Sequence, residues 1–291
     1  MKIILFSRKG IKPRTEDIEA IFGAIEHYGF SYAINKEFAE NIEEHSLRSI
    51  PAEFIYDKEV GTQPEESVMV CYGGDGTLLE GVHRLNGADI PVVGINGGHL
   101  GFLALAPREN IESVFADIAS KNLNLEQRDM LSVEGVFEGE TKKLYALNEV
   151  SIQRLGATMI SIEASIDGNI VSRYNSDGVI ISTPTGSTAY SLSAGGPILA
   201  PSCHSLLITP LAPHNLTMRP IVVPYSSEVK LHIKTRNNEA LISADNRTFK
   251  IANDSLLIIK KAKRYIRLAV PHNISFFDSL RNKMMWGVDI R

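Results

Sequence analysis

Residues 68–77, Val-Met-Val-Cys-Tyr-Gly-Gly-Asp-Gly-Thr, decide the fold of the first part of this chain. The first five are apolar or aromatic, as in a strand buried on both faces of a parallel sheet. Three glycines follow at once with Asp75 among them, and Thr77 can cap a helix that begins there. A strand, a glycine turn and a helix place a ligand at the carboxyl end of a sheet. The stretch therefore predicts an α/β domain with a site at this turn.

The glycines of this turn favour a phosphate ligand, because they let the backbone approach closely and successive N–H groups can bind an anion. A carboxylate among them would repel a phosphate, so Asp75 needs another purpose. It could take a proton, or it could face a metal ion or a sugar hydroxyl. A turn aspartate that bonds its own backbone explains the residue equally well. The motif alone leaves these alternatives open.

Size and composition narrow the class of protein. The 291 residues suffice for one large or two ordinary domains, and 44% are hydrophobic, which is typical of a globular core. The net charge of −4 and the lack of a long basic run argue against a nucleic-acid partner. Two cysteines, Cys71 and Cys203, favour a reducing cytoplasm over a disulfide frame or a zinc site. We expect no signal peptide and no membrane-spanning segment.

Strands and helices alternate over the first 126 residues, which predicts a parallel sheet with right-handed crossovers. Residues 36–66 are polar and carry no clear pattern. The expected elements are strands at Lys2–Phe6 and at residues 31–34, 68–72 and 91–95, with helices beginning near Thr15, Thr77 and Glu109.

The pattern changes near residue 127 to short strands separated by turns. Asp167-Gly168 between two strands is a strong hairpin signal, and Glu138-Gly139-Glu140 marks a second hairpin. Separate strands are expected at residues 255–260 and 265–270, and the stretch 275–286 reads as a helix again. We therefore expect an α/β domain of residues 1–126, rejoined by residues 272–291. Between them, residues 127–271 should form a β-rich, sandwich-like domain.

A second polar stretch, residues 182–193, follows a buried strand and is dense in hydroxyls with little charge. Such side chains suit hydrogen bonding to a polar ligand such as a nucleotide. A Ser/Thr-rich loop or a capped helix start explains them slightly better from these residues alone. The chain has no Walker motif, and neither glycine turn has the spacing of a Rossmann dehydrogenase.

Together, several stretches resemble the ordered signature of the NAD kinases. The turn at residues 73–77 is shared with lipid kinases of the diacylglycerol and sphingosine type, whereas the turn at residues 98–102 is far more specific. The resemblance runs from about residue 68 to residue 224. The matching stretches are Gly73-Gly74-Asp75-Gly76-Thr77, Gly98-His99-Leu100-Gly101-Phe102, Asn148-Glu149, Asp177-Gly178 leading to residues 182–190, and Arg219-Pro220.

The resemblance implies a phosphotransferase that moves the γ-phosphoryl group of ATP to the 2′-hydroxyl of the adenosine ribose of NAD, giving NADP and ADP. It also implies Mg²⁺ with ATP, a cytoplasmic location and a homo-oligomer, either a dimer or a tetramer, with no nucleic-acid or membrane partner. Two alternatives remain open. A lipid kinase would need an apolar pocket for acyl chains, and a non-catalytic dinucleotide-binding regulator would need no base.

The resemblance also implies roles for single residues. Asp75 would be the catalytic base, and no residue is assigned to a metal. Asn148 and Glu149 would hold the adenosine end of NAD, and Asp177 with residues 188–193 would bind the rest. The full set implied to bind the substrates is Gly74, Gly76, Phe102, Asn148, Glu149, Asp177, Thr188, Ala189, Tyr190, Ser191, Leu192, Ser193 and Ala212.

Two positions depart from the pattern of this family. Many bacterial members carry Arg where this chain has Asn175, and many have Asp-Gly-Gln where it has Asp245-Asn246-Arg247. We therefore assign no ligand contact to Asn175 or Arg247. No motif identifies the cationic residues that meet ATP.

Overall fold

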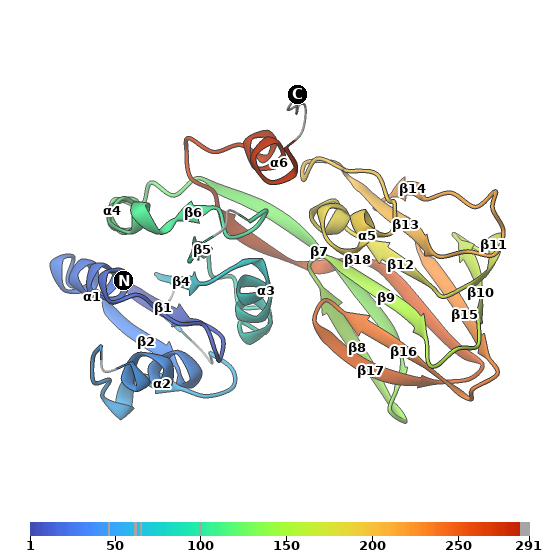
Figure 1. Cartoon of the computed structure of the whole chain (residues 1–291), viewed down its shortest axis with the longest axis horizontal. Coiled ribbons are helices and arrows are strands. Elements are labelled where there is room, and N and C mark those ends of the chain that lie inside the picture. The colour runs from blue at the N-terminus through green and yellow to red at the C-terminus, as the bar shows by residue number, and fades with distance from the viewer. Residues whose placement is uncertain (46, 61–62, 65, 99–100, 286–291) are drawn as a thin grey trace. The chain divides into compact units, whose positions relative to one another are not determined.

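The computed structural model describes residues 1–45, 47–60, 63–64, 66–98 and 101–285 (Figure 1). The chain divides into two compact units. The first unit comprises Met1–Gln127 and Ile266–Arg291, and the second comprises Arg128–Tyr265. The chain passes between the units within two long strands, β7 (Leu125–Phe137) and β18 (Ser255–Ala269).

A parallel sheet with the strand order β5-β4-β1-β2-β3 forms the centre of the first unit. Strand β4 is buried along its whole length, as its apolar sequence predicts. Two further segments pair with β5 in parallel: β6 and the end of β18. The strands are β1 (Lys2–Phe6), β2 (Ser31–Asn35), β3 (Ile55–Tyr56), β4 (Ser67–Tyr72), β5 (Val92–Asn96) and β6 (Ala106–Pro107).

Three helices of the first unit, α1 (Thr15–His27), α2 (Lys36–Glu44) and α4 (Ile111–Ala119), bury their apolar faces in a core shared with this sheet. α1 contributes Ile18, Ile21 and Phe22, and Gly29 follows its end with a φ of +63°. The helices are α1 (Thr15–His27), α2 (Lys36–Glu44), α3 (Asp75–Arg84), α4 (Ile111–Ala119) and α6 (Phe276–Met284), with 3₁₀ turns at Ala52–Phe54 and Arg108–Asn110. Of these, α2 lies in the stretch that the sequence left unassigned.

The start of α3 differs from the expectation. Thr77 does not cap this helix, because α3 begins at Asp75 and its N-cap is Gly74. Gly73 has a φ of +147°, and a methyl group on it would lie 2.5 Å from Oγ1 of Thr77. The glycines thus allow the chain to turn directly into the helix, and the Thr77 side chain packs over Gly73 inside the first turn.

Two antiparallel sheets form the second unit, and apolar side chains from both build one core. The first sheet has the order β11-β10-β15-β18, with β7 and β8 continuing from β18, and the second has the order β14-β13-β12-β9-β16-β17. The remaining strands are β8 (Glu140–Ala146), β9 (Glu149–Arg154), β10 (Ile160–Ile166), β11 (Asn169–Ser176), β12 (Gly178–Ser182), β13 (Ser205–Leu211), β14 (Ile221–Pro224), β15 (Val229–Thr235), β16 (Glu239–Ala244) and β17 (Arg247–Ala252), with a 3₁₀ turn at Thr185–Thr188 and a short α5 (Tyr190–Ser193).

The expected fold class is confirmed: an α/β part with a parallel sheet, a β-rich part, and a last helix, α6, that belongs to the first unit. The two strands expected at residues 255–260 and 265–270 are wrong, because β18 is one continuous strand of 15 residues. Ala262 is buried while its neighbours Lys261 and Lys263 are exposed, so the alternation of a strand persists through this charged stretch. Residue 286, which ends the expected last helix, lies outside the described residues. No helix within the described ranges is long and apolar enough to cross a membrane.

Candidate functional site

The two glycine turns of the first unit meet at the carboxylate of Asp75. Oδ2 of Asp75 accepts a hydrogen bond from the backbone N–H of Phe102 at 2.9 Å. Oδ1 accepts from the N–H groups of Leu103 at 3.0 Å and Ala104 at 2.9 Å. A residue from the first motif therefore holds the chain of the second motif, which local sequence could not show. His99 and Leu100 of the second motif lie outside the described residues.

Gly101 is required by this contact. A methyl group on Gly101 would lie 1.9 Å from Oδ1 and 2.6 Å from Cγ of Asp75, so the carboxylate packs directly against the glycine. The side chain of Asp75 is nevertheless 27% exposed. A carboxylate offers about four lone-pair positions, and the three N–H groups occupy three of them. One position on Oδ2 is left to accept a further hydrogen.

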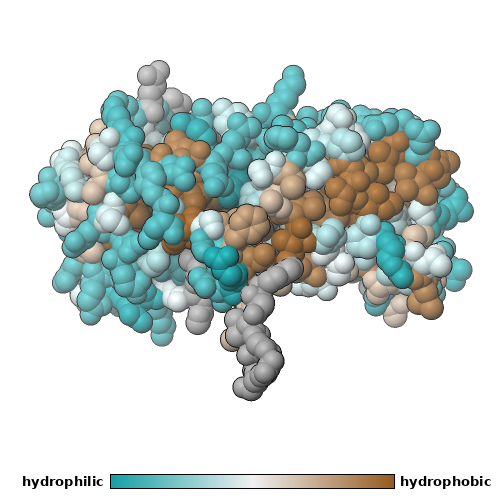
Figure 2. All heavy atoms as spheres, turned by 90° about the horizontal axis from the view of Figure 1, so that it is seen from above, coloured by the Kyte–Doolittle hydropathy of each residue, from teal (hydrophilic) through white to brown (hydrophobic). Residues whose placement is uncertain are grey.

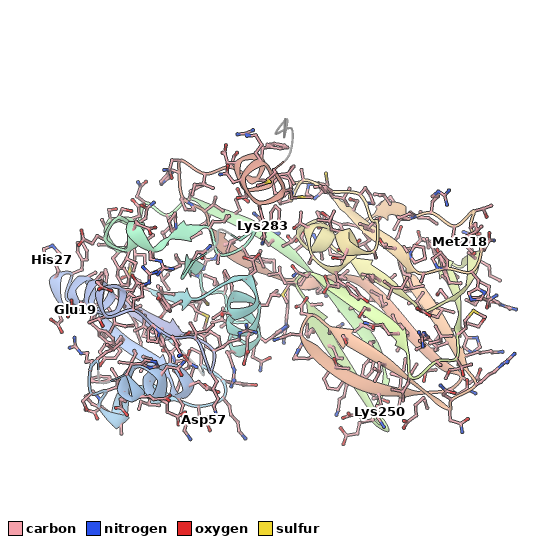
Figure 3. All side chains as sticks on the ribbon, viewed as in Figure 1. Glu19, His27, Asp57, Met218, Lys250 and Lys283 are labelled. Carbon is pink, nitrogen blue, oxygen red and sulfur yellow. The ribbon has the colours of Figure 1, made fainter. Side chains whose placement is uncertain are left out.

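Helix α6 contributes a cation to the same place. Nζ of Lys283, a residue labelled in Figure 3, lies 3.6 Å from Oδ2 of Asp75 and 5.0 Å from the centre of the Phe102 ring. The rings of Phe102 and Phe276 lie 6.1 Å apart. The last helix therefore places an aromatic ring and an ammonium group beside Phe102.

Two arginines lie beside the glycine turns, and sequence reasoning missed both. A methyl group on Gly76 would lie 3.3 Å from Nη1 of Arg8, and one on Gly98 would lie 3.5 Å from Nη2 of Arg108. Arg8 follows β1, and β1 pairs in parallel with β4, so both strands end at the same edge of the sheet. The strand order alone brings Arg8 to the turn, and no spacing in the sequence signals it.

Arg108 is positioned by a buried polar network. Its Nη1 lies 3.7 Å from Oδ2 of Asp17, and the hydroxyl of Tyr72 donates to the same oxygen at 2.6 Å. Burial and the neighbouring Asp17 raise the pKa of Tyr72 to about 12, so the phenol remains a donor. The network connects the end of β4 with the second glycine turn.

In the second unit, Asn148 and Glu149 stand at the start of β9 with buried, unpaired atoms. Oδ1 of Asn148 and Oε2 of Glu149 have no hydrogen-bond partner among the described residues. Burial, and secondly the negative charge of Asp245, raise the pKa of Glu149 to about 8. Its carboxyl group is therefore mostly protonated at neutral pH and can donate a hydrogen bond.

The beginning of the hydroxyl-rich stretch packs on the backbone that leads into Asn148 and Glu149. Oγ1 of Thr183 donates to the carbonyl of Leu147 at 2.6 Å, and the N–H of Thr183 donates to the carbonyl of Asn148 at 2.9 Å. A methyl group on Gly186 would lie 2.1 Å from the same Asn148 carbonyl oxygen. This part of the stretch thus has a defined structural role.

The predicted site residues 188–193 lie in the 3₁₀ turn and in α5, with different degrees of exposure. The hydroxyl of Thr188 donates to the carbonyl of Thr185 at 3.2 Å. Ser191 is fully buried and its Oγ lies 2.8 Å from Oγ1 of Thr209, so its hydroxyl is paired inside the unit. Ala189 and Leu192 are half-buried, whereas Tyr190 and Ser193 are exposed.

Asp177 and Ala212 lie close together at the ends of neighbouring strands. The N–H of Asp177 donates to the carbonyl of Leu211 at 3.0 Å, and Ala212 follows with a φ of +41°. Oδ1 of Asp177 accepts from Nε of Arg154 at 2.5 Å. Asn175 is exposed on β11, where its carbonyl accepts the N–H of His214. Arg154, which the sequence did not identify, is thus the cation that pairs with Asp177.

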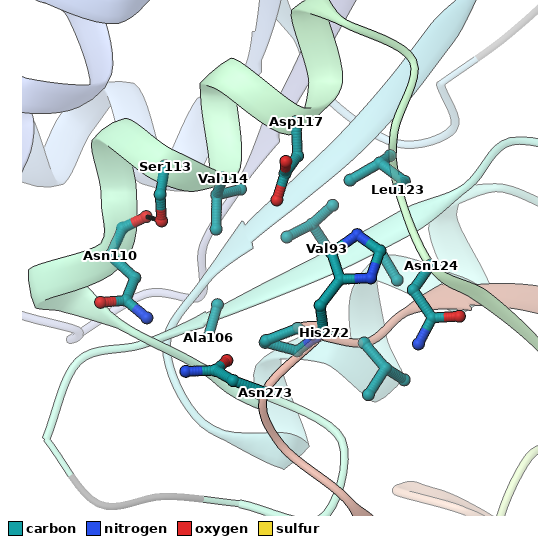
Figure 4. A pocket seen from close by; sticks show the side chains of 13 residues that line it. Val93, Ala106, Asn110, Ser113, Val114, Asp117, Leu123, Asn124, His272 and Asn273 are labelled. Atoms are coloured by element: carbon teal, nitrogen blue, oxygen red, sulfur yellow. Dashed lines mark hydrogen bonds between the residues drawn. The ribbon is translucent and has the colours of Figure 1, made fainter.

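A cavity of about 170 Å³ in the first unit contains none of the predicted site residues (Figure 4). Val93, Val114 and Leu123 supply apolar lining, and Asn110, just before α4, and Asp117 on α4 line it with polar groups. The family motifs do not build this cavity. The described residues also hold no cluster of three or more His, Cys, Asp or Glu side chains that could bind a metal ion.

Comparison with known proteins assigns this chain to the class of nucleotide-dependent kinases. The chain matches the ATP-NAD kinase N-terminal domain over residues 33–122 and the ATP-NAD kinase C-terminal domain over residues 147–270. It is 37% identical over 295 residues to an NAD kinase of Flavobacterium psychrophilum, with 100% of each chain covered. The chain therefore belongs to the NAD kinase family, as its motifs predicted.

Two solved structures share the fold. The crystal structure of yeast NADH kinase complexed with NADH has a TM-score of 0.84 and 24% identity, and the match covers 100% of this chain and 89% of that one. The NAD kinase from Archaeoglobus fulgidus in complex with ATP has a TM-score of 0.72 and 24% identity, covering 97% and 99%. At this level of identity the two likenesses show the fold.

Proposed function

We propose that this NAD kinase family member transfers the γ-phosphoryl group of ATP to the 2′-hydroxyl of the adenosine ribose of NAD, with Asp75 as the base. Family membership supports a kinase that acts on NAD over a lipid kinase or a non-catalytic regulator. One structural observation supports the proposed role of Asp75 as the base. Its carboxylate is held by the backbone N–H groups of Phe102, the last residue of the second family motif, and of Leu103 and Ala104, and it keeps one acceptor position on a partly exposed oxygen.

In the proposed reaction the ribose 2′-hydroxyl donates to Oδ2 of Asp75. As the 2′-oxygen forms its bond to the γ-phosphorus, the bond from this phosphorus to the β,γ-bridging oxygen breaks and ADP leaves. The hydroxyl proton passes to Asp75. Most of the rate enhancement should come from alignment and from charge neutralisation of the phosphates. In this proposal Mg²⁺ enters with ATP as part of the substrate.

Cations and glycines around the turns would hold the phosphates. Arg8 lies beside Gly76, and Lys283 lies beside Asp75. Gly74 has no side chain to block a phosphate at the N-terminus of α3. We assign ATP contact to Arg8 and Lys283; the support is that Lys283 lies beside Asp75 and Arg8 beside the adjacent Gly76.

Most residues that recognise NAD in this proposal belong to the second unit, and Phe102 of the first unit is added as a stacking surface. Asn148 offers a buried acceptor and the protonated Glu149 a buried donor, and adenosine can pair with both. Asp177 and Ala212, with residues 188–193, bind the rest of the dinucleotide. Phe102 and Tyr190 are the proposed stacking surfaces. The proposed domains are residues 1–126 with 272–291, which carry the base, and residues 127–271, which bind NAD.

The protein is further proposed to be a cytoplasmic homo-oligomer, either a dimer or a tetramer. Large apolar side chains stay exposed in the second unit: Ile170 at 71%, Leu216 at 85% and Val222 at 48%. Ile170 and Val222 belong to β11 and β14, which are end strands of the two sheets. Figure 2 shows apolar areas among polar ones on the molecular surface. Exposed apolar side chains on end strands favour association with another copy.

The test is a direct assay of the whole chain with ATP, MgCl₂ and NAD, in which a NADP-specific dehydrogenase detects the product. We expect NADP to accumulate, and diacylglycerol or sphingosine in place of NAD to give no phosphorylated product. Folded protein that binds NAD but makes no NADP would instead support the regulator. Phosphorylation of the lipid alone would support the lipid kinase. Light scattering of the same sample measures the oligomer.

A further inference from the structure

Asp245 lies in a turn that is distant in sequence and holds the backbone of Asn148 and Glu149. It lies between β16 and β17 with a φ of +52°. Its Oδ2 accepts from the N–H of Leu147 at 2.8 Å, and its Oδ1 accepts from those of Asn148 at 2.8 Å and Glu149 at 3.2 Å. In return, the N–H of Asp245 donates to the carbonyl of Glu149 at 3.0 Å. Four hydrogen bonds thus join one turn residue to three consecutive residues.

The opposite side of this backbone is held as well. Thr183 bonds the carbonyl groups of Leu147 and Asn148, and the α-carbon of Gly186 packs against the Asn148 carbonyl. Because the main chain is bonded on both sides, the backbone that carries the side chains of Asn148 and Glu149 is fixed in position. Their buried oxygens, unpaired within the described structure, are therefore presented in a fixed arrangement.

We propose that Asp245 is a positioning residue for dinucleotide recognition, because its carboxylate fixes residues 147–149 so that Asn148 and Glu149 meet the adenosine part of NAD. This inference rests on the proposed function. In this role Asp245 acts through the backbone of residues 147–149, because both lone pairs of its Oδ1 and one of its Oδ2 are directed to N–H groups there. Asp75 holds residues 102–104 of the first unit through the same arrangement of three N–H donors.

Asp245 also acts on Glu149 through its negative charge. Burial and this charge favour the protonated Glu149 carboxyl, and the backbone N–H of Tyr190 acts in the opposite direction. Arg247 lies near Asp245 as a partly buried cation, and its Nη2 donates to the carbonyl of Tyr145 at 2.6 Å. With Asp245 present, Glu149 can act as a donor to adenine or ribose acceptors at neutral pH. Without the charge, Glu149 should ionise at a lower pH.

The test compares two single substitutions at left-handed hairpin positions, which Asn tolerates as well as Asp. Asp245→Asn keeps the size, but its one oxygen can accept only two of the three N–H groups, and its NH₂ group faces the third. Asp254→Asn is the matched control. Asp254 has a φ of +63°, its side chain is 68% exposed, and it bonds His232 rather than the backbone of Asn148 and Glu149.

For Asp245→Asn we expect the KM and the calorimetric Kd for NAD to rise about 10-fold, the usual effect of a lost buried hydrogen bond. The kcat and the KM for ATP should stay within a few-fold of the parent, and Asp254→Asn should match the parent throughout. A second readout is the pH profile of NAD affinity. Affinity should decline as Glu149 ionises, and this decline should move to lower pH in Asp245→Asn, which a purely structural defect would not cause.

Should Asp245→Asn fail to fold, Asp245→Glu keeps the charge but shifts the oxygens by one methylene. We then expect weaker NAD binding with an unshifted pH profile. The inference is overturned if the Asp245 variant shows the NAD affinity and pH profile of the Asp254 control, or if it loses ATP and NAD binding equally. A parent protein that makes no NADP is a different outcome, which contradicts the proposed function itself.

Discussion

Replacement of Asp75 by Asn tests the proposed chemistry most directly, and the structure shows that it changes two properties at once. Asn cannot take a proton at neutral pH, so loss of the base should lower kcat by at least ~100-fold. The amide also has one oxygen where the carboxylate has two. It can accept two of the three N–H groups of residues 102–104, and its NH₂ group faces the third. One backbone N–H is therefore left unpaired, which should lower the unfolding free energy by roughly 1–3 kcal/mol.

A control variant must disturb this contact but keep the carboxylate, and Gly101→Ala does so. Its new methyl group would lie 1.9 Å from Oδ1 of Asp75, so the loop or the side chain of Asp75 has to shift, while the carboxylate keeps its ability to take a proton. Initial rates at saturating ATP and NAD give kcat for both variants, and calorimetry gives the Kd for NAD. Urea unfolding reports the loss of stability. We expect Asp75→Asn to lose at least about 10-fold more kcat than Gly101→Ala at similar stability.

Three results would refute the reasoning about Asp75. Turnover of Asp75→Asn within a few-fold of the parent would end the assignment as base. Equal losses in Asp75→Asn and Gly101→Ala would mean that Asp75 acts only by holding the second glycine turn. Partial rescue of Asp75→Asn by excess MgCl₂ would point to a metal contact instead, because a missing base does not respond to metal.

Three further predictions concern single side chains. Thr188→Val should raise the KM for NAD and leave that for ATP nearly unchanged, whereas an equal rise in both would mean that the hydroxyl serves only its bond to Thr185. The pKa of Glu149 is raised from an ordinary 4.5 to about 8 in the folded state. Between pH 4.5 and pH 8 the folded state therefore keeps a proton on Glu149 that the unfolded state has released. Stability should therefore fall as the pH rises from 4.5 to 8, and urea unfolding of Glu149→Gln should lack this component. Tyr72→Phe removes the donor to the buried Asp17 carboxylate and should lower the unfolding free energy by roughly 1–3 kcal/mol, so an unchanged urea midpoint would contradict the network.

Local patterns in the sequence determined the type and order of most elements. The apolar run at residues 68–72 is a buried strand, the spacing of Ile18, Ile21 and Phe22 is a helix face, and Asp167-Gly168 is a hairpin turn. Each of these depends on residues a few positions apart, so periodicity and turn chemistry suffice to predict them. The ordered motifs likewise identified the family from the sequence alone. Where local signals conflicted, as in the charged part of β18, the prediction was wrong because pairing with neighbouring strands decided the outcome.

Tertiary structure alone decided which of these elements meet. Arg8 reaches the first glycine turn because β1 pairs with β4, and Gly101 must be glycine because Asp75 packs against it. Asp245 bonds the N–H of Asn148 across 97 positions of sequence. Such contacts depend on strand order and on the packing of whole sheets, and the residues involved carry no periodic or turn signal that would pair them. For this reason the sequence identified the residues of the two motifs, and only the fold showed the aspartates that hold them in place.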